Sequence, residues 1–211
     1  MNSAHPCILL TGFEPFGGES VNPSWEIARA LDGWACEGHR VHAALLPCVF
    51  GDALLRLDEA LAAYRPALVV CLGLAGGRTE ISVERVAINV DDARIPDNSG
   101  RQPIDAAVEP GGPAAYFSTL PIKAIARDVG AAGLAASVSN TAGTFVCNHV
   151  FYALMHRLAM RPGLAQARGG FVHVPHMSAM ALADQVAGIR QVLRTAVLTR
   201  DDVRETAGRE H

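Results

Sequence analysis

The stretch Ala67-Leu-Val-Val-Cys-Leu72 follows Pro66 and consists entirely of hydrophobic residues. A short continuous apolar run of this kind is typical of a strand buried on both faces of a parallel sheet. The segment before it, residues 52–64, reads as a helix that ends ahead of the proline. This order predicts a parallel sheet whose strands alternate with helices.

The same alternation extends toward both ends of the chain. Further strands are predicted at residues 7–11, 40–46, 81–90, 135–139 and 170–174. Further helices are predicted to start at Asn22-Pro23, with Asn as the cap, and to cover residues 121–129, 147–160 and 178–198. We therefore expect an α/β protein, a single-domain α/β/α sandwich over residues 1–211 with an open, mostly parallel central sheet. The charged tail 199–211 can fray, and the long polar connection 91–112 is of a kind that often carries function.

The composition narrows the classes of partner. The chain of 211 residues is 50% hydrophobic, and 18 Lys and Arg against 21 Asp and Glu leave a net charge of −3. Without a basic excess, we expect neither nucleic acid nor an anionic membrane as a partner. The most apolar stretch, residues 67–75, is far shorter than the roughly 20 residues that span a bilayer.

The cysteines indicate the compartment. Cys7, Cys36, Cys48, Cys71 and Cys147 form an odd set without CxxC spacing. This argues against a disulfide framework and against a structural zinc site. The first residues also lack the features of a signal peptide. A cytoplasmic protein is therefore expected.

Cys147 is the cysteine best placed for chemistry. It opens a predicted helix, whose N-terminal dipole favours a thiolate and whose backbone N–H groups could hold an oxyanion. The alternative is a packing role, because Cys147 aligns with Phe151, Leu154 and Leu158 on the buried stripe of that helix. Its position alone favours packing.

His173 and Glu84 are the candidate partners of such a nucleophile. His173 ends a predicted strand, where open sheets bind ligands, although the pattern alone slightly favours a core histidine bonded to a backbone carbonyl. Alternation within residues 81–90 puts Glu84 on one face with Val86 and Ile88, where a carboxylate needs a partner. That partner could be a catalytic imidazole or a neighbouring arginine. Cysteine, histidine and an acid together would serve nucleophilic catalysis.

The other histidines give weaker signals. His176 follows His173 by three residues, but this spacing at a strand end does not bring both rings to one metal, so no metal site is expected. His149 and His156 belong to the helix that Cys147 opens, as surface or packing residues.

The glycine-bearing loop TGFEPFGG, residues 11–18, follows the first predicted strand. Its spacing matches neither the dinucleotide fingerprint nor the P-loop, and Glu14 would repel phosphate. Phe13 and Phe16 instead suggest a flat apolar binding pocket. The alternative is that both side chains only pack under the loop.

At these residues the sequence resembles the pyroglutamyl peptidase I family of cysteine peptidases, also called pyrrolidone-carboxylate peptidases. TGFEPFGG followed by VNPSWE is similar to the family's N-terminal signature, and GLAGGRTEISVERVAINVDDARIPDNSG is similar to its glutamate motif. GTFVCNHVFYALMH and FVHVP are similar to its cysteine and histidine motifs. The resemblance runs over nearly the whole chain and implies Glu84, Cys147 and His173 as the catalytic set.

The resemblance also implies a fold, a reaction and a pocket. It implies an open α/β/α sandwich that acts in the cytosol without metal or organic cofactor, often as a homotetramer. The implied substrate is a peptide with an N-terminal pyroglutamyl residue, whose following amide bond is hydrolysed through a thioester. The residues implied to bind this substrate are Phe13, Phe16, Asn22, Leu74, Arg94, Phe145 and Val146.

Leu74 departs from the family pattern. Relatives usually have GQAGGR where this chain has GLAGGR at residues 73–78, and leucine cannot form the side-chain hydrogen bond that glutamine offers. Losing a buried partner costs about 1–3 kcal/mol, roughly 5- to 150-fold in affinity or rate. An alternative function therefore stays open, a non-catalytic or specificity-shifted binder of capped peptides or lactams. A nucleotide-binding protein would need the glycine fingerprint that the chain lacks.

Overall fold

The computed structural model describes residues 6–208. Its main sheet contains the strands β1 (Cys7–Phe13), β2 (Ala35–Cys36), β3 (His39–Leu46), β4 (Leu68–Leu74), β5 (Ile81–Glu84), β8 (Ala136–Ser139) and β9 (Arg168–Val174). These are ordered β2-β3-β1-β4-β9-β5-β8. Neighbours run parallel, except that β2 is antiparallel to β3 and β5 is antiparallel to β9. The expected mostly parallel sheet is confirmed.

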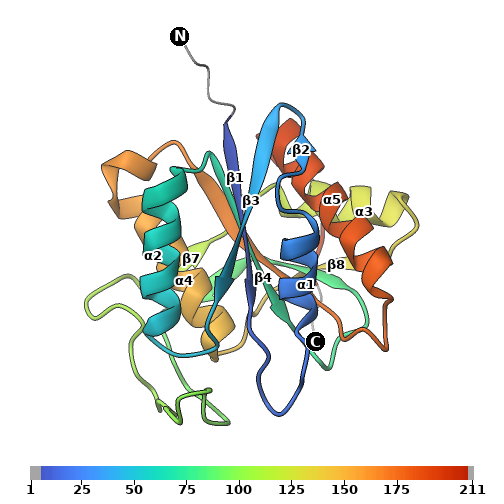
Figure 1. Ribbon diagram of the computed structural model, residues 1–211. Coiled ribbons are helices and arrows are strands. Elements are labelled where there is room, and N and C mark those ends of the chain that lie inside the picture. The colour runs from blue at the N-terminus through green and yellow to red at the C-terminus, as the bar shows by residue number, and fades with distance from the viewer. Residues whose placement is uncertain (1–5, 209–211) are drawn as a thin grey trace.

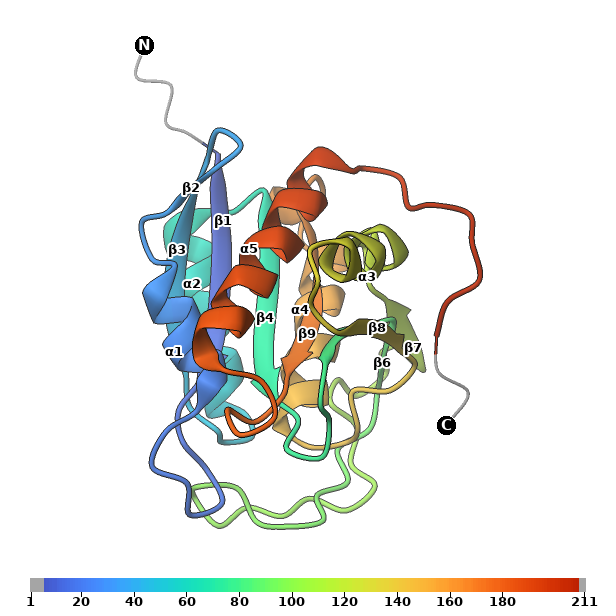
Figure 2. The same ribbon diagram turned by 90° about the vertical axis from the view of Figure 1, so that its right-hand side faces the viewer.

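Helices cover both faces of this sheet (Figure 1). One face carries α2 (Asp52–Tyr64) and α4 (Val146–Met160), which is followed by the short 3-10 helix η1 (Pro162–Leu164). The other carries α1 (Pro23–Ala30), α3 (Ile122–Ala131) and α5 (Leu182–Leu198), which Figure 2 shows in front of the sheet. None of the helices within residues 6–208 is long and apolar enough to cross a membrane.

The continuous apolar runs have a simple structural cause. Along β4, Val69 and Cys71 pack in the core beneath α2 and α4, whereas Leu68, Val70 and Leu72 pack in the core beneath α1 and α5. Successive residues of a strand point to opposite faces, so a strand covered on both sides has no solvent-facing position. This explains why Ala67–Leu72 shows no alternation.

Several predicted boundaries are confirmed, and one helix begins late. The helix at residues 52–64 has the predicted limits. Asn22 caps α1, accepting a hydrogen bond from the backbone of Ser24. The helix predicted over residues 178–198 starts only at Leu182, because the preceding residues form a turn in which Ser178 N–H donates to His176 Nδ1.

The strand predicted over residues 81–90 is wrong as one element. The chain leaves the main sheet at Arg85, whose N–H donates to Ser139 O and whose carbonyl accepts from Ser118 N–H. It then forms β6 (Val86–Ile88), which pairs antiparallel with β7 (Ala115–Phe117) in a separate two-stranded ribbon. The alternation predicted that Glu84 shares a face with Val86 and Ile88. Because the chain changes sheets at Arg85, it does not.

The described part of the C-terminal tail runs along α3 and β8. Asp202 accepts hydrogen bonds from the backbone N–H groups of Lys123 and Ala124, at 3.0 and 2.9 Å, and so caps the start of α3. Arg168 donates to Thr199 O at 2.9 Å. Residues 209–211 of the predicted tail lie outside the described residues.

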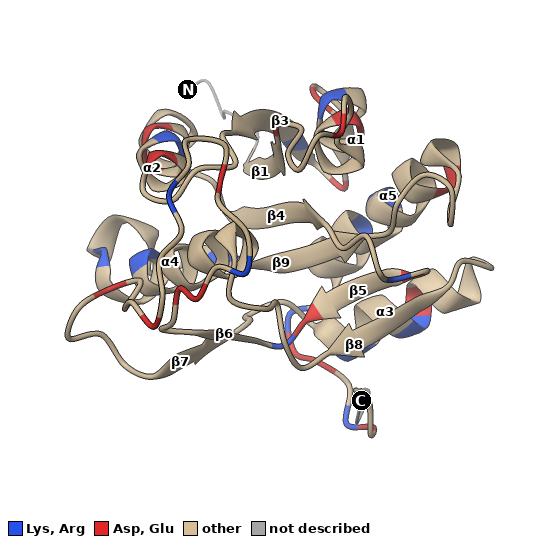
Figure 3. Cartoon of the chain, turned by 90° about the horizontal axis from the view of Figure 1, so that it is seen from below, with Lys and Arg blue, Asp and Glu red and all other residues tan. Residues whose placement is uncertain are grey.

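The end of the sheet at which β1, β4 and β9 finish carries the long loops. Figure 3 shows the chain from below, with acidic and basic residues interspersed among the loops. Ligands of open α/β sheets bind at this end, next to the point where the direction of the connections changes. By the strand order that point lies between β1 and β4, and on the other side of β4 is the junction of β9 with the antiparallel β5.

Candidate active site

His173 and Glu84 meet at this junction. The pairing of His173 with Ser82 places Glu84 two residues further along β5, on the same face of the sheet. His173 Nδ1 lies 2.7 Å from Glu84 Oε1, and the two residues are 4% and 0% exposed. Because an ionised carboxylate can only accept, Nδ1 carries the proton and Nε2 is left free to act as a base.

Arg78 is the second partner of Glu84. Its guanidinium donates to Glu84 Oε1 at 2.6 Å and to Thr141 O at 2.9 Å. Burial favours the neutral acid, but the hydrogen bond to His173 and the charge of Arg78 outweigh it, so the pKa of Glu84 lies below its usual value. The sequence left an imidazole and an arginine as alternatives, and the structure contains both.

The arginine is not the one adjacent in sequence. Arg85 points away and donates to Asn140 Oδ1 at 2.8 Å. Arg78 comes instead from the end of the Gly-Leu-Ala-Gly-Gly-Arg stretch, which opens the glutamate motif but was not named there as a partner of Glu84. Its position in that motif was the available signal.

Cys147 lies against β4, the neighbour of the strand β9 that carries His173. Gly73 is opposite His173 in the register of β4 and β9, and a Cβ built on Gly73 would lie 2.8 Å from Cys147 Sγ. Glycine thus leaves the space that the thiol occupies. Desolvation by burial raises the pKa of the Cys147 thiol above its usual range, so the resting side chain keeps its proton and needs a base.

The start of α4 offers hydrogen-bond donors beside the thiol. Phe145 is the N-cap residue and Cys147 belongs to the first turn. Phe145 makes no side-chain capping bond, so the N-cap residue itself leaves the first N–H groups of the helix unoccupied. Such groups can stabilise a developing oxyanion.

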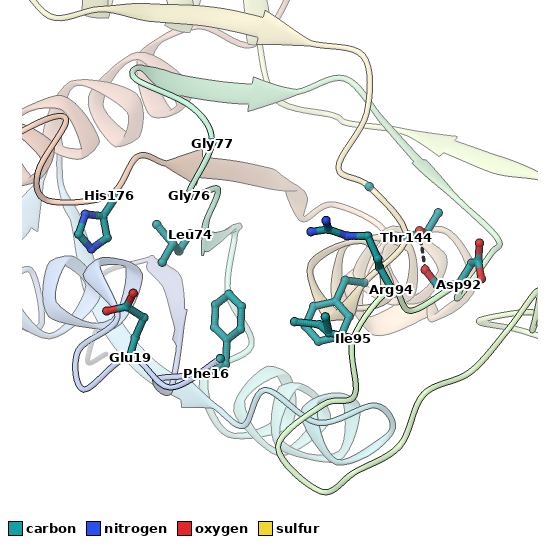
Figure 4. A pocket seen from close by; sticks show the side chains of 13 residues that line it. Phe16, Glu19, Leu74, Gly76, Gly77, Asp92, Arg94, Ile95, Thr144 and His176 are labelled. Carbon is teal, nitrogen blue, oxygen red and sulfur yellow. Dashed lines mark hydrogen bonds between the residues drawn. The ribbon is translucent and has the colours of Figure 1, made fainter.

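A cavity of about 1030 Å³ opens beside the end of β4, at Leu74, and the start of α4, at Phe145 (Figure 4). It is lined by Phe16, Gly17, Glu19, Leu74, Gly76, Gly77, Asp92, Arg94, Ile95, Gly143, Thr144, Phe145 and His176. Four of the seven substrate-binding residues expected from the resemblance are in this set: Phe16, Leu74, Arg94 and Phe145. Figure 4 shows Leu74 and Phe16 near the centre, with the Arg94 guanidinium directed into the space.

The other three expected residues lie in the core. Phe13 is 2% exposed and contacts Phe171, with 6.4 Å between the ring centroids. Asn22 is also 2% exposed, and its amide donates to Glu14 O and accepts from Ser24. Val146 is fully buried. None of the three is part of the cavity lining, and their roles stay predictions.

Other cavity residues were missed by the sequence analysis. Glu19 and His176 form one side of the cavity, and Ile95 and Thr144 belong to the other. Thr144 and Ile95 adjoin predicted site residues, which was a usable signal. Phe50, which contacts the Phe145 ring edge-on at 5.5 Å, had no signal, because the contact joins two distant loops.

A helix-start thiol with a buried histidine–glutamate pair beside it defines, together with this α/β fold, a cysteine peptidase. The comparisons with known proteins agree. The chain is 57% identical to the pyrrolidone-carboxylate peptidase of Cupriavidus taiwanensis, over 98% of this chain and 100% of that protein. It is 54% identical to the protein of that name from Escherichia fergusonii, over 91% of each chain.

Solved structures give the same result at the level of the fold. The crystal structure of pyroglutamyl peptidase I from Bacillus amyloliquefaciens matches with a TM-score of 0.92 and 42% identity, covering 96% of this chain and 100% of that one. Pyrrolidone carboxyl peptidase from Thermococcus litoralis matches with a TM-score of 0.91 and 34% identity, covering 95% and 99%. The pyroglutamyl peptidase family model matches residues 7–199, and the chain belongs to this family.

Proposed function

We propose that this cysteine peptidase hydrolyses the amide bond that follows an N-terminal pyroglutamyl residue, with Cys147, His173 and Glu84 as its catalytic residues. The observation that carries the proposal is the buried His173–Glu84 pair, at 2.7 Å, one strand away from the thiol seated on Gly73. The Nε2 atom of His173 is the base that the protonated thiol requires. The names of the relatives supply the substrate.

The reaction then has two acyl-transfer steps. Cys147 Sγ attacks the pyroglutamyl carbonyl while His173 Nε2 takes the thiol proton, and the first N–H groups of α4 receive the oxyanion. The imidazolium gives its proton to the departing amine, leaving a thioester. Water, deprotonated by His173, hydrolyses the thioester and releases pyroglutamate. Glu84 keeps the proton on Nδ1 throughout and stabilises the imidazolium.

Arg78 extends this arrangement by one residue. It shares Glu84 Oε1 with His173 and is anchored on Thr141 O, so it holds the carboxylate in position and ionised. A buried carboxylate without this second partner would be easier to protonate and would bind the imidazolium less tightly.

The cavity suits a neutral, flat cap. The rings of Phe16 and Phe145 lie 6.2 Å apart, between centroids, and form an apolar wall on which a lactam ring can pack. Arg94 faces the cavity and is the cation available to the reacting carbonyl. His176, which follows β9, lines the side of the cavity opposite Arg94 together with Glu19.

The alternative of a non-catalytic binder has no support. It rested on Leu74, yet His173 and Glu84 form the buried pair that the reaction needs, and the relatives are named peptidases. Leu74 ends β4 beside Val174 and lines the cavity, so its effect is expected on substrate binding.

We further propose a cytoplasmic location and a homotetramer. All five cysteines are free, which suits a reducing compartment. Tetramerisation is implied by the family resemblance, and exposed apolar side chains such as Leu55 and Phe117, 66% and 69% exposed, offer contact surface. Light scattering after size-exclusion chromatography measures the assembly, and a monomer at micromolar concentration would contradict it.

The decisive assay is release of aminomethylcoumarin from its pyroglutamyl amide, with the prolyl amide as the control substrate. The wild type is expected to cleave only the pyroglutamyl compound. Cys147→Ala should be folded and inactive, whereas Cys7→Ala, a matched change at the start of β1, should keep activity. Turnover retained by Cys147→Ala would refute the thioester mechanism, and an inactive, folded wild type would refute the proposed reaction.

A further inference from the structure

The helix that carries Cys147 holds a second buried histidine–carboxylate pair. His149 is 5% exposed, and its Nδ1 lies 2.8 Å from Asp91 Oδ2. The backbone N–H of Gly51 donates to His149 Nε2 at 3.1 Å. Because this N–H can only donate, Nε2 is unprotonated and Nδ1 carries the proton that Asp91 accepts. The neutral ring therefore connects two segments that are distant in sequence.

The segment after Asp91 forms one side of the cavity. Asp92, Arg94 and Ile95 all line it. Asp92 is also tied to the start of α4, since its N–H donates to Thr144 O at 3.0 Å and its carbonyl accepts from Thr144 Oγ1 at 2.8 Å. Backbone bonds between Asp91 and Ala106 and from Ala93 N–H to Pro103 O also hold this segment, and the Asp91 side chain adds a contact to α4 three residues before Arg94.

The segment before Gly51 supports the aromatic wall. Phe50 contacts the His149 ring edge-on at 5.2 Å and the Phe145 ring edge-on at 5.5 Å. Phe145 in turn contacts Phe16, and both rings line the cavity. His149 therefore holds, through Gly51 and Phe50, the back of the surface on which a flat ring would pack.

Asp91 depends on this histidine. Its Oδ1 is buried and has no hydrogen-bond partner within residues 6–208, so the His149 N–H is the donor that its side chain receives there. A buried carboxylate that loses its donor is strongly disfavoured, and the backbone around it shifts toward water.

We propose that His149, paired with Asp91, is a positioning residue for the reaction. It holds the Arg94 segment and the Phe50–Phe145 wall in the arrangement that binds the substrate. His149 itself touches neither the lactam ring nor the reacting carbonyl. This inference rests on the proposed peptidase activity for its kinetic consequence, but not for its structural one.

Two substitutions separate the two contacts of His149. His149→Asn keeps an amide N–H near the place of Nδ1, for Asp91, and loses the acceptor for Gly51. His149→Gln keeps an acceptor near the place of Nε2 and loses the donor to Asp91. His156→Gln is the matched control, because His156 lies on the same helix, bonds Tyr116 at 2.9 Å and is not part of the cavity lining.

Kinetics distinguish positioning from a purely structural role. Both His149 variants should lower kcat/KM for the pyroglutamyl amide about tenfold or more, the effect of one lost hydrogen bond to a buried partner. Alkylation of Cys147 by iodoacetamide needs only the thiol and its base. Its rate in both variants should therefore stay within about twofold of the wild-type rate. A role in stability alone would lower the thermal midpoint and leave kcat/KM of the folded variants unchanged. That result, or an alkylation rate that falls together with kcat/KM, would overturn the proposal.

Hydrogen exchange tests the same arrangement without substrate. The amides of residues 91–95, next to the lost Asp91 contact, should exchange faster in His149→Gln than in the wild type. The amide of Gly51, whose acceptor this variant keeps, and all amides of the His156→Gln control should match the wild type. Equal protection in all three proteins would refute the positioning role, whatever the activity. A wild type that is inert on the pyroglutamyl amide would refute the proposed function instead, and the exchange result would still decide the role of His149.

Discussion

Replacing Gly73 by alanine tests where the nucleophile sits. The added Cβ would lie 2.8 Å from Cys147 Sγ and 2.8 and 2.9 Å from Cζ and Cε1 of Phe171. Ordinary contacts between such atoms are about 3.5–4.0 Å, so the thiol and the ring must each give way by roughly 1 Å. Overpacking of this kind costs about 1–3 kcal/mol of stability. A displacement of about 1 Å at a reacting atom costs roughly 100-fold in rate.

The assay compares kcat/KM for the pyroglutamyl amide with the free energy of unfolding in urea. Gly169→Ala is the matched control, because Gly169 lies on the neighbouring strand β9 and its added Cβ would lie 2.9 Å from Leu158 Cδ1 and 3.1 Å from Val69 O, away from the thiol. The control should lose stability but keep its activity per folded molecule. If folded Gly73→Ala turns over like the wild type, Cys147 is not seated against Gly73, and its placement beside His173 is wrong.

Three further substitutions should change the activity or the stability in a defined direction. Arg78→Gln should lower kcat about tenfold. It should also move the acid limb of the pH profile of kcat to higher pH, because the pKa of Glu84 rises when the arginine is lost. An acid limb at the wild-type pH would contradict the pairing of Arg78 with Glu84. The lowered pKa of Glu84 means that its stabilising contribution is complete above the unfolded value of about 4.3 and is lost as the pH falls through the folded one. The free energy of unfolding in urea should therefore fall less steeply between about pH 5 and 3 for Glu84→Gln than for the wild type or for Glu59→Gln, an exposed control. Parallel slopes would refute this. Leu74→Gln should raise kcat/KM about tenfold if a polar group at the cavity wall reaches the lactam, and no gain would show that the backbone already supplies the contact.

The elements that the sequence predicts well are those specified by near neighbours. The helix at residues 52–64 follows from its own periodicity and the proline after it, and α1 follows from its Asn-Pro start. The strand β4 follows from an apolar run that only a doubly covered strand can bury. Each signal spans a few residues, so no knowledge of the rest of the fold is required.

The break at Arg85 shows where such reasoning stops. Residues 81–90 look like one strand, but a strand exists only with its partners, and the partners change there from β8 and β9 to β7. The strand β7 is only three residues long and follows the polar connection 91–112, so it carries no pattern of its own. Because strand pairing is non-local, the alternation that put Glu84 beside Val86 was misleading.

Residue type and motif were enough to single out Cys147, His173 and Glu84 and to connect them with one family. Their mutual placement was not readable, because Glu84 and His173 are 89 residues apart and meet only through the antiparallel pairing of β5 with β9. The same holds for the Gly51–His149 contact, which spans 98 residues. The choice of Arg78 rather than Arg85 as the partner of Glu84 was likewise made by packing. Chemical capability is a property of each residue, whereas the partner that each buried polar group finds depends on which distant segments the folded core brings together.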